Sequence, residues 1–194
     1  MSVQGVLSLA VQTVVAPRDV ARLLLSIRPG REALATAFAL VVVLNALVFQ
    51  GSRLLMPGPV PPLLGNPVSF LVLQGGTLAL TALALTWTAR LFDGRGRFEE
   101  VALLLIWMQG LRVLVQAALM LILPLSAGLG TLALAVGTAV GVWILLNFLD
   151  EVHGLGSLFK AALVLMLGVI AMAFALSVLL ALAGVTPNEM TTNV

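Results

Sequence analysis

The chain alternates between long apolar runs and short polar segments, and the lengths of the runs predict membrane-spanning helices. A lipid hydrocarbon core of about 30 Å requires roughly 20 apolar residues in helical form. Five segments of the sequence approach or exceed this length, namely 33–49, 68–91, 101–123, 129–149 and 158–184. We therefore expect an all-α polytopic membrane protein with five transmembrane helices.

The polar segments between these runs are rich in residues that end helices. Residues 50–67 contain five prolines and three glycines, and neither residue type continues a helix readily. The stretch "RLFDGRGRFEE" after the second run is predicted to be a polar turn, Pro124 starts a short turn, and "DEVHGLGS" is predicted to be a loop. Residues 186–194 are expected to form a polar tail.

The first 30 residues are too polar in their second half to span a membrane, and they predict an amphipathic helix at its surface. In "APRDVARLLLSIRP" one helical face carries apolar residues and the opposite face mostly polar ones: Val20, Leu23, Leu24 and Ile27 against Arg18, Asp19, Arg22 and Ser26. This pattern is typical of an interfacial helix with arginines at lipid head groups, here Arg18, Arg22 and Arg28. The alternative is that the apolar face packs on the protein itself. The predicted division is thus an interfacial segment at 1–30, a transmembrane domain at 31–185 and the tail.

Basic residues lie mainly on one side of the predicted spans. Eight flank that side, and only Arg53 flanks the other: Arg18, Arg22, Arg28, Arg31, Arg90, Arg95, Arg97 and Lys160. Because cytoplasmic flanks carry the excess of Lys and Arg, this count predicts a cytoplasmic N-terminus and a C-terminus outside. The preference for Arg over Lys, together with abundant Ala, Gly, Leu and Val, suggests a GC-rich bacterial genome and hence a bacterial inner membrane.

Composition supports a membrane protein and excludes several other classes. The chain is 61% hydrophobic and 9% charged, whereas about 25% of residues in soluble domains are charged. A net charge of +2 gives no indication of nucleic-acid binding. The sequence has no Cys, so it has neither a thiol nucleophile nor a thiolate metal site.

No catalytic motif is present, and the predicted loops are too short to hold a catalytic domain. The sole histidine, His153, follows Asp150 and Glu151, a set from which a metal or acid–base site could be imagined. A zinc site normally needs three or four well-placed protein ligands. We therefore favour a solvated rim between two helices and predict no enzyme activity, no metal and no cofactor.

The third predicted span contains a charge, Arg112, and this residue is the strongest candidate for a functional site. Gln109, Arg112 and Gln116 recur at helical spacing, so they project from one face. An arginine at the centre of a span costs about 2.5–3.5 kcal/mol, which the apolar residues of this span outweigh. Asn45 and Thr77 fall at similar depths in the first two spans. We expect these five residues to form a polar midplane cluster that binds a ligand or partner, or else a hydrogen-bonded structural core.

Small residues recur every four positions along the fourth span, at Ala133, Gly137 and Gly141, and similar spacing occurs at Gly168, Ala171 and Ala175 in the fifth. Such stripes let another helix backbone approach closely. They predict helix packing inside the bundle, with a homodimer face as the alternative.

Three stretches taken together resemble bacterial Yip1-domain proteins: "VVAPRDVARLLLSIRPGREAL", "RLFDGRGRFEEVALLLIW" and "VWILLNFLDEVHGLGSLFKAALVLML". The resemblance implies a compact five-helix membrane bundle with a cytoplasmic N-terminus. Eukaryotic members of that family are associated with Rab GTPases, vesicle trafficking and membrane shaping. This sequence has no Tyr and therefore lacks the Tyr-containing Asp-Leu-Tyr-Gly-Pro stretch of the eukaryotic branch.

These observations favour a non-catalytic membrane protein that acts as a scaffold or accessory subunit. Its expected partners are membrane lipids, together with other membrane proteins or further copies of the chain. The alternative is a small transporter or channel that uses the polar cluster around Arg112, because transport sites commonly lie near the membrane midplane.

Overall fold

The computed structural model describes residues 3–55, 58, 62–122 and 127–182, and in this part of the chain all regular structure is helical. The elements are α1 (Val3–Val15), α2 (Pro17–Ile27), α3 (Arg31–Leu55), α4 (Pro62–Gly65), α5 (Pro67–Ala89), η1 (Arg90–Phe92), α6 (Phe98–Ile122), α7 (Ala127–His153) and α8 (Leu158–Leu182).

Five of these helices, α3, α5, α6, α7 and α8, are long and apolar enough to cross a membrane, which confirms the predicted spans. The largest differences from the predicted boundaries lie at the ends of two helices. Helix α3 continues to Leu55, and α7 continues to His153, so Asp150 to His153 form its last turn and not a loop. The predicted tail at 186–194 lies outside the described residues.

The end of α7 is explained by a glycine. Gly154 has a left-handed backbone with φ of 63°, and the N–H of Leu155 donates to the carbonyl of Asp150 at 3.1 Å. A glycine in this conformation just past a helix, with that hydrogen bond, terminates helices commonly. The junction then turns the chain directly into α8.

Polar caps also define the start of α5. The side chain of Asn66 accepts hydrogen bonds from the backbone N–H groups of Val68 and Ser69, and Pro67 occupies the first turn. Both features are favoured at helix N-termini.

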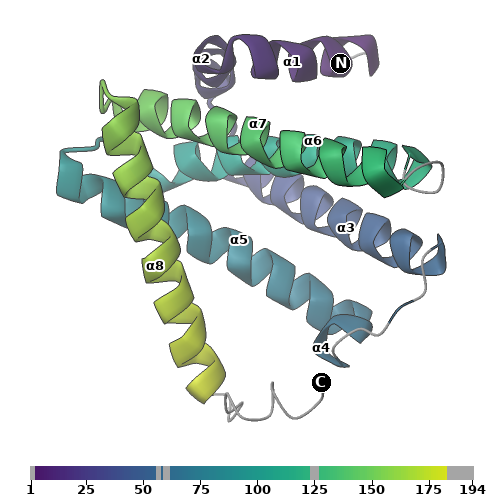
Figure 1. Cartoon of the computed structure of the whole chain (residues 1–194). Helices are drawn as coiled ribbons and strands as arrows, with labels where there is room; N and C mark the ends of the chain where they lie inside the picture. Colours follow the sequence, from purple (N-terminus) through teal and green to yellow (C-terminus); the bar gives the residue numbers. More distant parts are fainter. Residues whose placement is uncertain (1–2, 56–57, 59–61, 123–126, 183–194) are drawn as a thin grey trace.

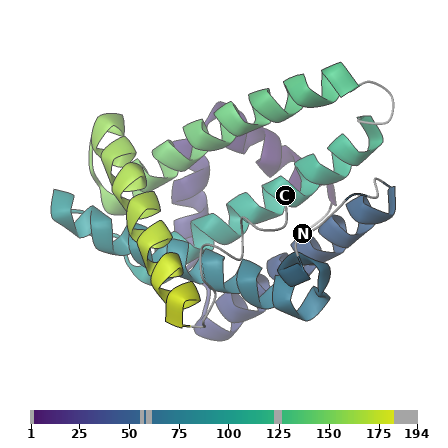
Figure 2. The same ribbon diagram turned by 60° about the horizontal axis from the view of Figure 1, so that its bottom comes forward.

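The spanning helices meet at one end of the molecule and spread apart toward the other (Figures 1 and 2). The ends of α5 and α7 lie near the starts of α6 and α8, and α8 then diverges from α7. The best-buried large side chains are concentrated at the closed end, among them Leu85, Val101, Phe148 and Leu149. Apolar side chains farther along the spans, such as Val72 and Phe174, are exposed, as expected for surfaces that lipid covers.

Helices α1 and α2 lie across the bundle beside α6 and α7 (Figure 1). Val20, Ala21 and Leu24 of α2 are buried, whereas Leu23 and Ile27 are exposed. Helix α1 is connected to α6 by a hydrogen bond from Trp107 Nε1 to Thr13 Oγ1 at 3.1 Å. Part of the apolar face of α2 therefore packs on the protein.

Candidate functional site

Arg112 lies beside a cavity of about 330 Å³ between α3, α5 and α6. One part of the lining is polar and the other apolar: Asn45, Ser52, Gln74, Arg112 and Gln116, with Val48, Phe49, Phe70, Leu119 and Met120. Arg112 is 14 residues from the start of α6 and 10 from its end, or about 21 and 15 Å along the axis. The cavity thus lies at membrane depth, in the half of the bundle away from α2.

The guanidinium of Arg112 has no hydrogen-bond or ion-pair partner among the described residues. Seven of the eight acidic residues are described, and all seven lie near α2 or at the closed end of the bundle: Asp19, Glu32, Asp93, Glu99, Glu100, Asp150 and Glu151. The eighth, Glu189, is outside the described residues. The described chain therefore supplies no counter-charge at the depth of Arg112.

The structure brings together three of the five residues predicted to form the polar cluster. Asn45, Arg112 and Gln116 line the cavity, whereas Gln109 and Thr77 do not. The side-chain oxygen of Gln109 is buried without a partner in the described chain. Thr77 is half-buried in α5, and its backbone carbonyl accepts a hydrogen bond from Thr81 Oγ1 at 2.7 Å. The binding role of the cluster stays a prediction.

Asn45 and Ser52 each use one donor within α3. Asn45 Nδ2 donates to the carbonyl of Val41 at 2.8 Å, and Ser52 Oγ donates to the carbonyl of Phe49 at 2.7 Å. Their side-chain oxygens remain available as acceptors toward the cavity. A bound group could therefore combine a negative charge near Arg112 with donors near these oxygens.

The sequence did not indicate the apolar half of the cavity. Phe49 and Phe70 stack with ring centroids 4.4 Å apart and an angle of 9° between the rings. In sequence they are two of many apolar residues in spans, and nothing distinguishes them. Gln74 was also missed, although a glutamine within a span is a signal that could have identified it.

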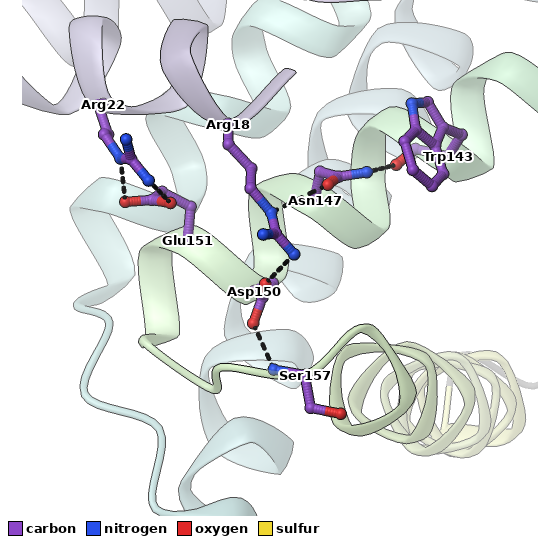
Figure 3. Close-up of polar contacts among 7 residues, drawn as sticks. All are labelled: Arg18, Arg22, Trp143, Asn147, Asp150, Glu151 and Ser157. Atoms are coloured by element: carbon purple, nitrogen blue, oxygen red, sulfur yellow. Dashed lines mark hydrogen bonds and ion pairs between the residues drawn. The ribbon is translucent and has the colours of Figure 1, made fainter. Parts of the chain in front are cut away.

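A second polar site joins α2 to the end of α7 (Figure 3). Arg18 donates to Asp150 Oδ2 at 2.6 Å and to Asn147 Oδ1 at 3.1 Å, and Asp150 Oδ1 accepts from the backbone N–H of Ser157 at 2.9 Å. Asp150 and Asn147 are both buried. One carboxylate thus connects α2, α7 and the start of α8.

Arg22 forms a parallel contact on the exposed side of α2 (Figure 3). Its guanidinium donates to both carboxylate oxygens of Glu151, at 2.8 and 3.2 Å. The hydrogen bond and the charge of Glu151 raise the pKa of Arg22. Arg18 and Arg22, predicted to lie at lipid head groups, thus both make ion pairs with α7, whereas Arg28 is exposed in a left-handed conformation that ends α2.

The prediction of a solvated rim at Asp150 and His153 is wrong. Side chains of both residues are buried, because α2 and residues 94–97 cover the end of α7. Both ring nitrogens of His153 lack a partner in the described chain. The described residues contain no group of three potential metal ligands.

Gly96 packs against His153 and was not recognised in the sequence. A β-carbon at this position would lie 2.5 Å from His153 Nδ1 and 2.8 Å from the carbonyl of Val152. The backbone N–H of the preceding residue, Arg95, donates to the carbonyl of His153 at 3.1 Å. The "DGRGRFEE" turn therefore closes over the end of α7, which is why it needs a glycine there.

The small-residue stripes differ in how tightly they pack. A β-carbon on Gly137 would reach ordinary contact with Val115 at 3.9 Å, and one on Gly141 would meet nothing within 4 Å. Ala133, one turn earlier, is half-buried. By contrast, a β-carbon on Gly168 would lie 2.6 Å from Leu85, so it is α5 and α8 that approach closely.

Five long apolar helices, with α1 and α2 packed against α6 and α7, define a multi-pass membrane protein. The sequence pattern of the Yip1 domain matches residues 11–179, which include α2 and all five spans. The chain therefore belongs to the Yip1 domain family, which confirms the family indicated by the three stretches; the bacterial branch stays a prediction. No curated protein and no solved structure matches the chain.

Proposed function

We propose that this Yip1-domain protein is a non-catalytic membrane protein that binds other membrane components, as a scaffold or accessory subunit. The observation that carries the proposal is Arg112, a cation at membrane depth beside a cavity, with no counter-charge in the described chain. The anionic group that Arg112 binds would then belong to another membrane component.

Energetics favour such a partner. An arginine in a span costs about 2.5–3.5 kcal/mol when it remains in the hydrocarbon, so a group that pairs with it gains from relieving that cost. Charge-assisted hydrogen bonds to a guanidinium are also stronger than neutral ones. A cavity that already holds Arg112 at its side needs little rearrangement to accept an anion.

The excess of basic residues near α2 supports an orientation with α1 and α2 on the cytoplasmic side of a bacterial inner membrane. In this orientation the Arg112 cavity lies toward the outer half of the bilayer. A partner that reaches Arg112 would do so from within the membrane or from the outside.

The test is affinity purification in a mild detergent, with quantitative mass spectrometry of the proteins and lipids that remain bound. The wild-type chain is compared with Arg112→Gln and with Arg53→Gln, a matched loss of charge at the same end of the bundle but outside the cavity. We expect Arg112→Gln to lose a bound component that the wild type and Arg53→Gln retain. Identical sets of bound components in all three would contradict the proposal.

A small transporter or channel is the second candidate, because polar side chains line a cavity at membrane depth. Proteoliposomes containing the purified chain distinguish the two functions. Solute flux by a homogeneous preparation, abolished in Arg112→Gln, would support transport over binding. Stoichiometric retention of a membrane component without flux would support binding.

A further inference from the structure

We infer that the Arg112 cavity binds an anionic amphiphile, with a phosphate-bearing headgroup at Arg112 and an apolar chain against Phe49 and Phe70. This inference rests on the proposed function and names the chemical class of the bound component. Three features of the cavity support it: its unpaired cation, its division into a polar and an apolar part, and its position in the apolar surface.

The polar part suits a headgroup phosphate. Arg112 offers several N–H donors in a planar fork, which matches the geometry of a phosphate, and Gln116 adds an amide. Asn45 and Ser52 already donate within α3, so their oxygens can accept from a headgroup hydroxyl. None of the described residues that line the cavity carries a carboxylate, so no negative charge in the lining repels an anion.

The apolar part suits a hydrocarbon chain. Phe49 and Phe70 stack beside Leu119 and Met120, a surface that a free inorganic anion would leave bare. Covering apolar surface contributes about 25 cal/mol per Å². A ligand with both a charged head and a chain therefore uses the whole lining, whereas a free anion uses half of it.

The surroundings of the cavity provide access from the membrane. Arg112 is itself exposed, and Phe49 and Phe70 are only half-buried, so the cavity opens at the surface of the bundle. A volume of about 330 Å³ corresponds to roughly ten waters at about 30 Å³ each. The cavity thus accommodates a headgroup and the start of a chain, and the remainder of the amphiphile would lie outside it, in the membrane.

The experiment titrates the purified full chain in detergent with phosphatidylglycerol and with phosphatidylcholine, and counts bound lipids by native mass spectrometry. We expect phosphatidylglycerol to bind more tightly than phosphatidylcholine. Arg112→Gln should weaken phosphatidylglycerol binding roughly tenfold and remove the preference over phosphatidylcholine. Arg53→Gln should retain both the affinity for phosphatidylglycerol and this preference. Equal binding by the wild type and Arg112→Gln would overturn the inference.

Two further variants identify the source of the anion. Phe49→Ala should weaken the binding of phosphatidylglycerol severalfold. Glycerol 3-phosphate, which has the headgroup but no chain, should compete poorly with the lipid. If glycerol 3-phosphate competes at concentrations equal to that of the lipid, the cavity is a site for free anions, and the inference of an amphiphilic ligand is overturned. Glu189→Gln should leave lipid binding unchanged; a roughly tenfold gain would show that this residue of the chain occupies the site instead.

The inference and the proposed function fail in different ways. If Arg112→Gln loses a protein partner but keeps its lipids, the proposed function stands and the inference of an amphiphilic ligand is wrong. If Arg112→Gln changes neither proteins nor lipids, both are wrong. The size-exclusion elution of each variant, compared with Arg53→Gln, confirms that it is folded.

Discussion

At the scale of single residues, the end of α7 depends on contacts that join distant parts of the sequence. Asp150 accepts from Arg18, which is 132 positions earlier in the chain, and His153 packs against Gly96. Sequence patterns report neighbours along one helix, so "DEVH" suggested a solvated loop. The glycine at 154 was the local signal that could have placed the helix end correctly.

Gly96→Ala is expected to destabilise the protein by about 1–3 kcal/mol, because its β-carbon would overlap His153 and the Val152 carbonyl. Gly110→Ala is the control, since a β-carbon there meets nothing within 4 Å. Thermal unfolding in detergent measures both. A melting temperature for Gly96→Ala equal to that of Gly110→Ala would contradict the close contact.

Asp150→Ala is expected to lower the free energy of unfolding by about 2–4 kcal/mol, because it removes the partner of Arg18 and leaves the N–H of Ser157 without its acceptor. Glu99→Ala is the control, an acid near the same end whose ion pair to Arg97 is 3.8 Å long. Such an exposed pair contributes at most about 1 kcal/mol. Similar losses of unfolding free energy in the two variants would show that the Asp150 network does not stabilise the protein.

At the scale of helices, the pattern of apolar runs predicted all five spans, because hydrocarbon thickness alone determines their length. It did not predict which faces would meet. The stripe on α7 leaves Gly141 in open space, whereas Gly168 of α8 lies against Leu85. Small residues permit close packing on any face, and tertiary structure decides which of them is used.

Gly168→Leu is therefore expected to destabilise the contact between α5 and α8 by about 1–3 kcal/mol, whereas Gly141→Leu should leave stability unchanged. Thermal unfolding of the two variants in detergent provides the comparison. The reverse order would mean that the α7 stripe, and not α8, holds helices together. A change of oligomeric state confined to Gly141→Leu would indicate a face between two copies.

Packing of α2 on the bundle predicts a difference in labelling between two of its positions. The chain has no Cys, so Val20→Cys and Leu23→Cys each provide a single reactive thiol. Val20 is 2% exposed and Leu23 50% exposed, so a maleimide should modify Leu23→Cys much faster. Adding Arg18→Ala should accelerate modification of Val20→Cys by loosening α2.

The same variants report orientation. A membrane-impermeant maleimide should label Leu23→Cys in inside-out vesicles and not in intact spheroplasts. Labelling in spheroplasts alone would reverse the proposed topology, and equal rates at the two positions would contradict the docking of α2.

At the scale of the whole molecule, the sequence predicted the class of protein and part of the candidate site. Arg112 and Gln116 were recognised because they share a helix face, and Asn45 from its depth. Thr77 was placed by depth alone, which does not determine the direction in which a side chain points. The convergence of the helices at one end depends on contacts between α2, residues 94–97 and α7, which no single segment reveals.

The central claim is that Arg112 pairs with an anionic group of another membrane component. The most direct measurement is an experimental structure of the full chain in nanodiscs of native membrane lipids, at a resolution that shows bound lipids and side chains. The account predicts a phosphate or carboxylate from outside the chain within about 3 Å of the Arg112 guanidinium. A guanidinium that contacts only water and groups of its own chain would contradict it.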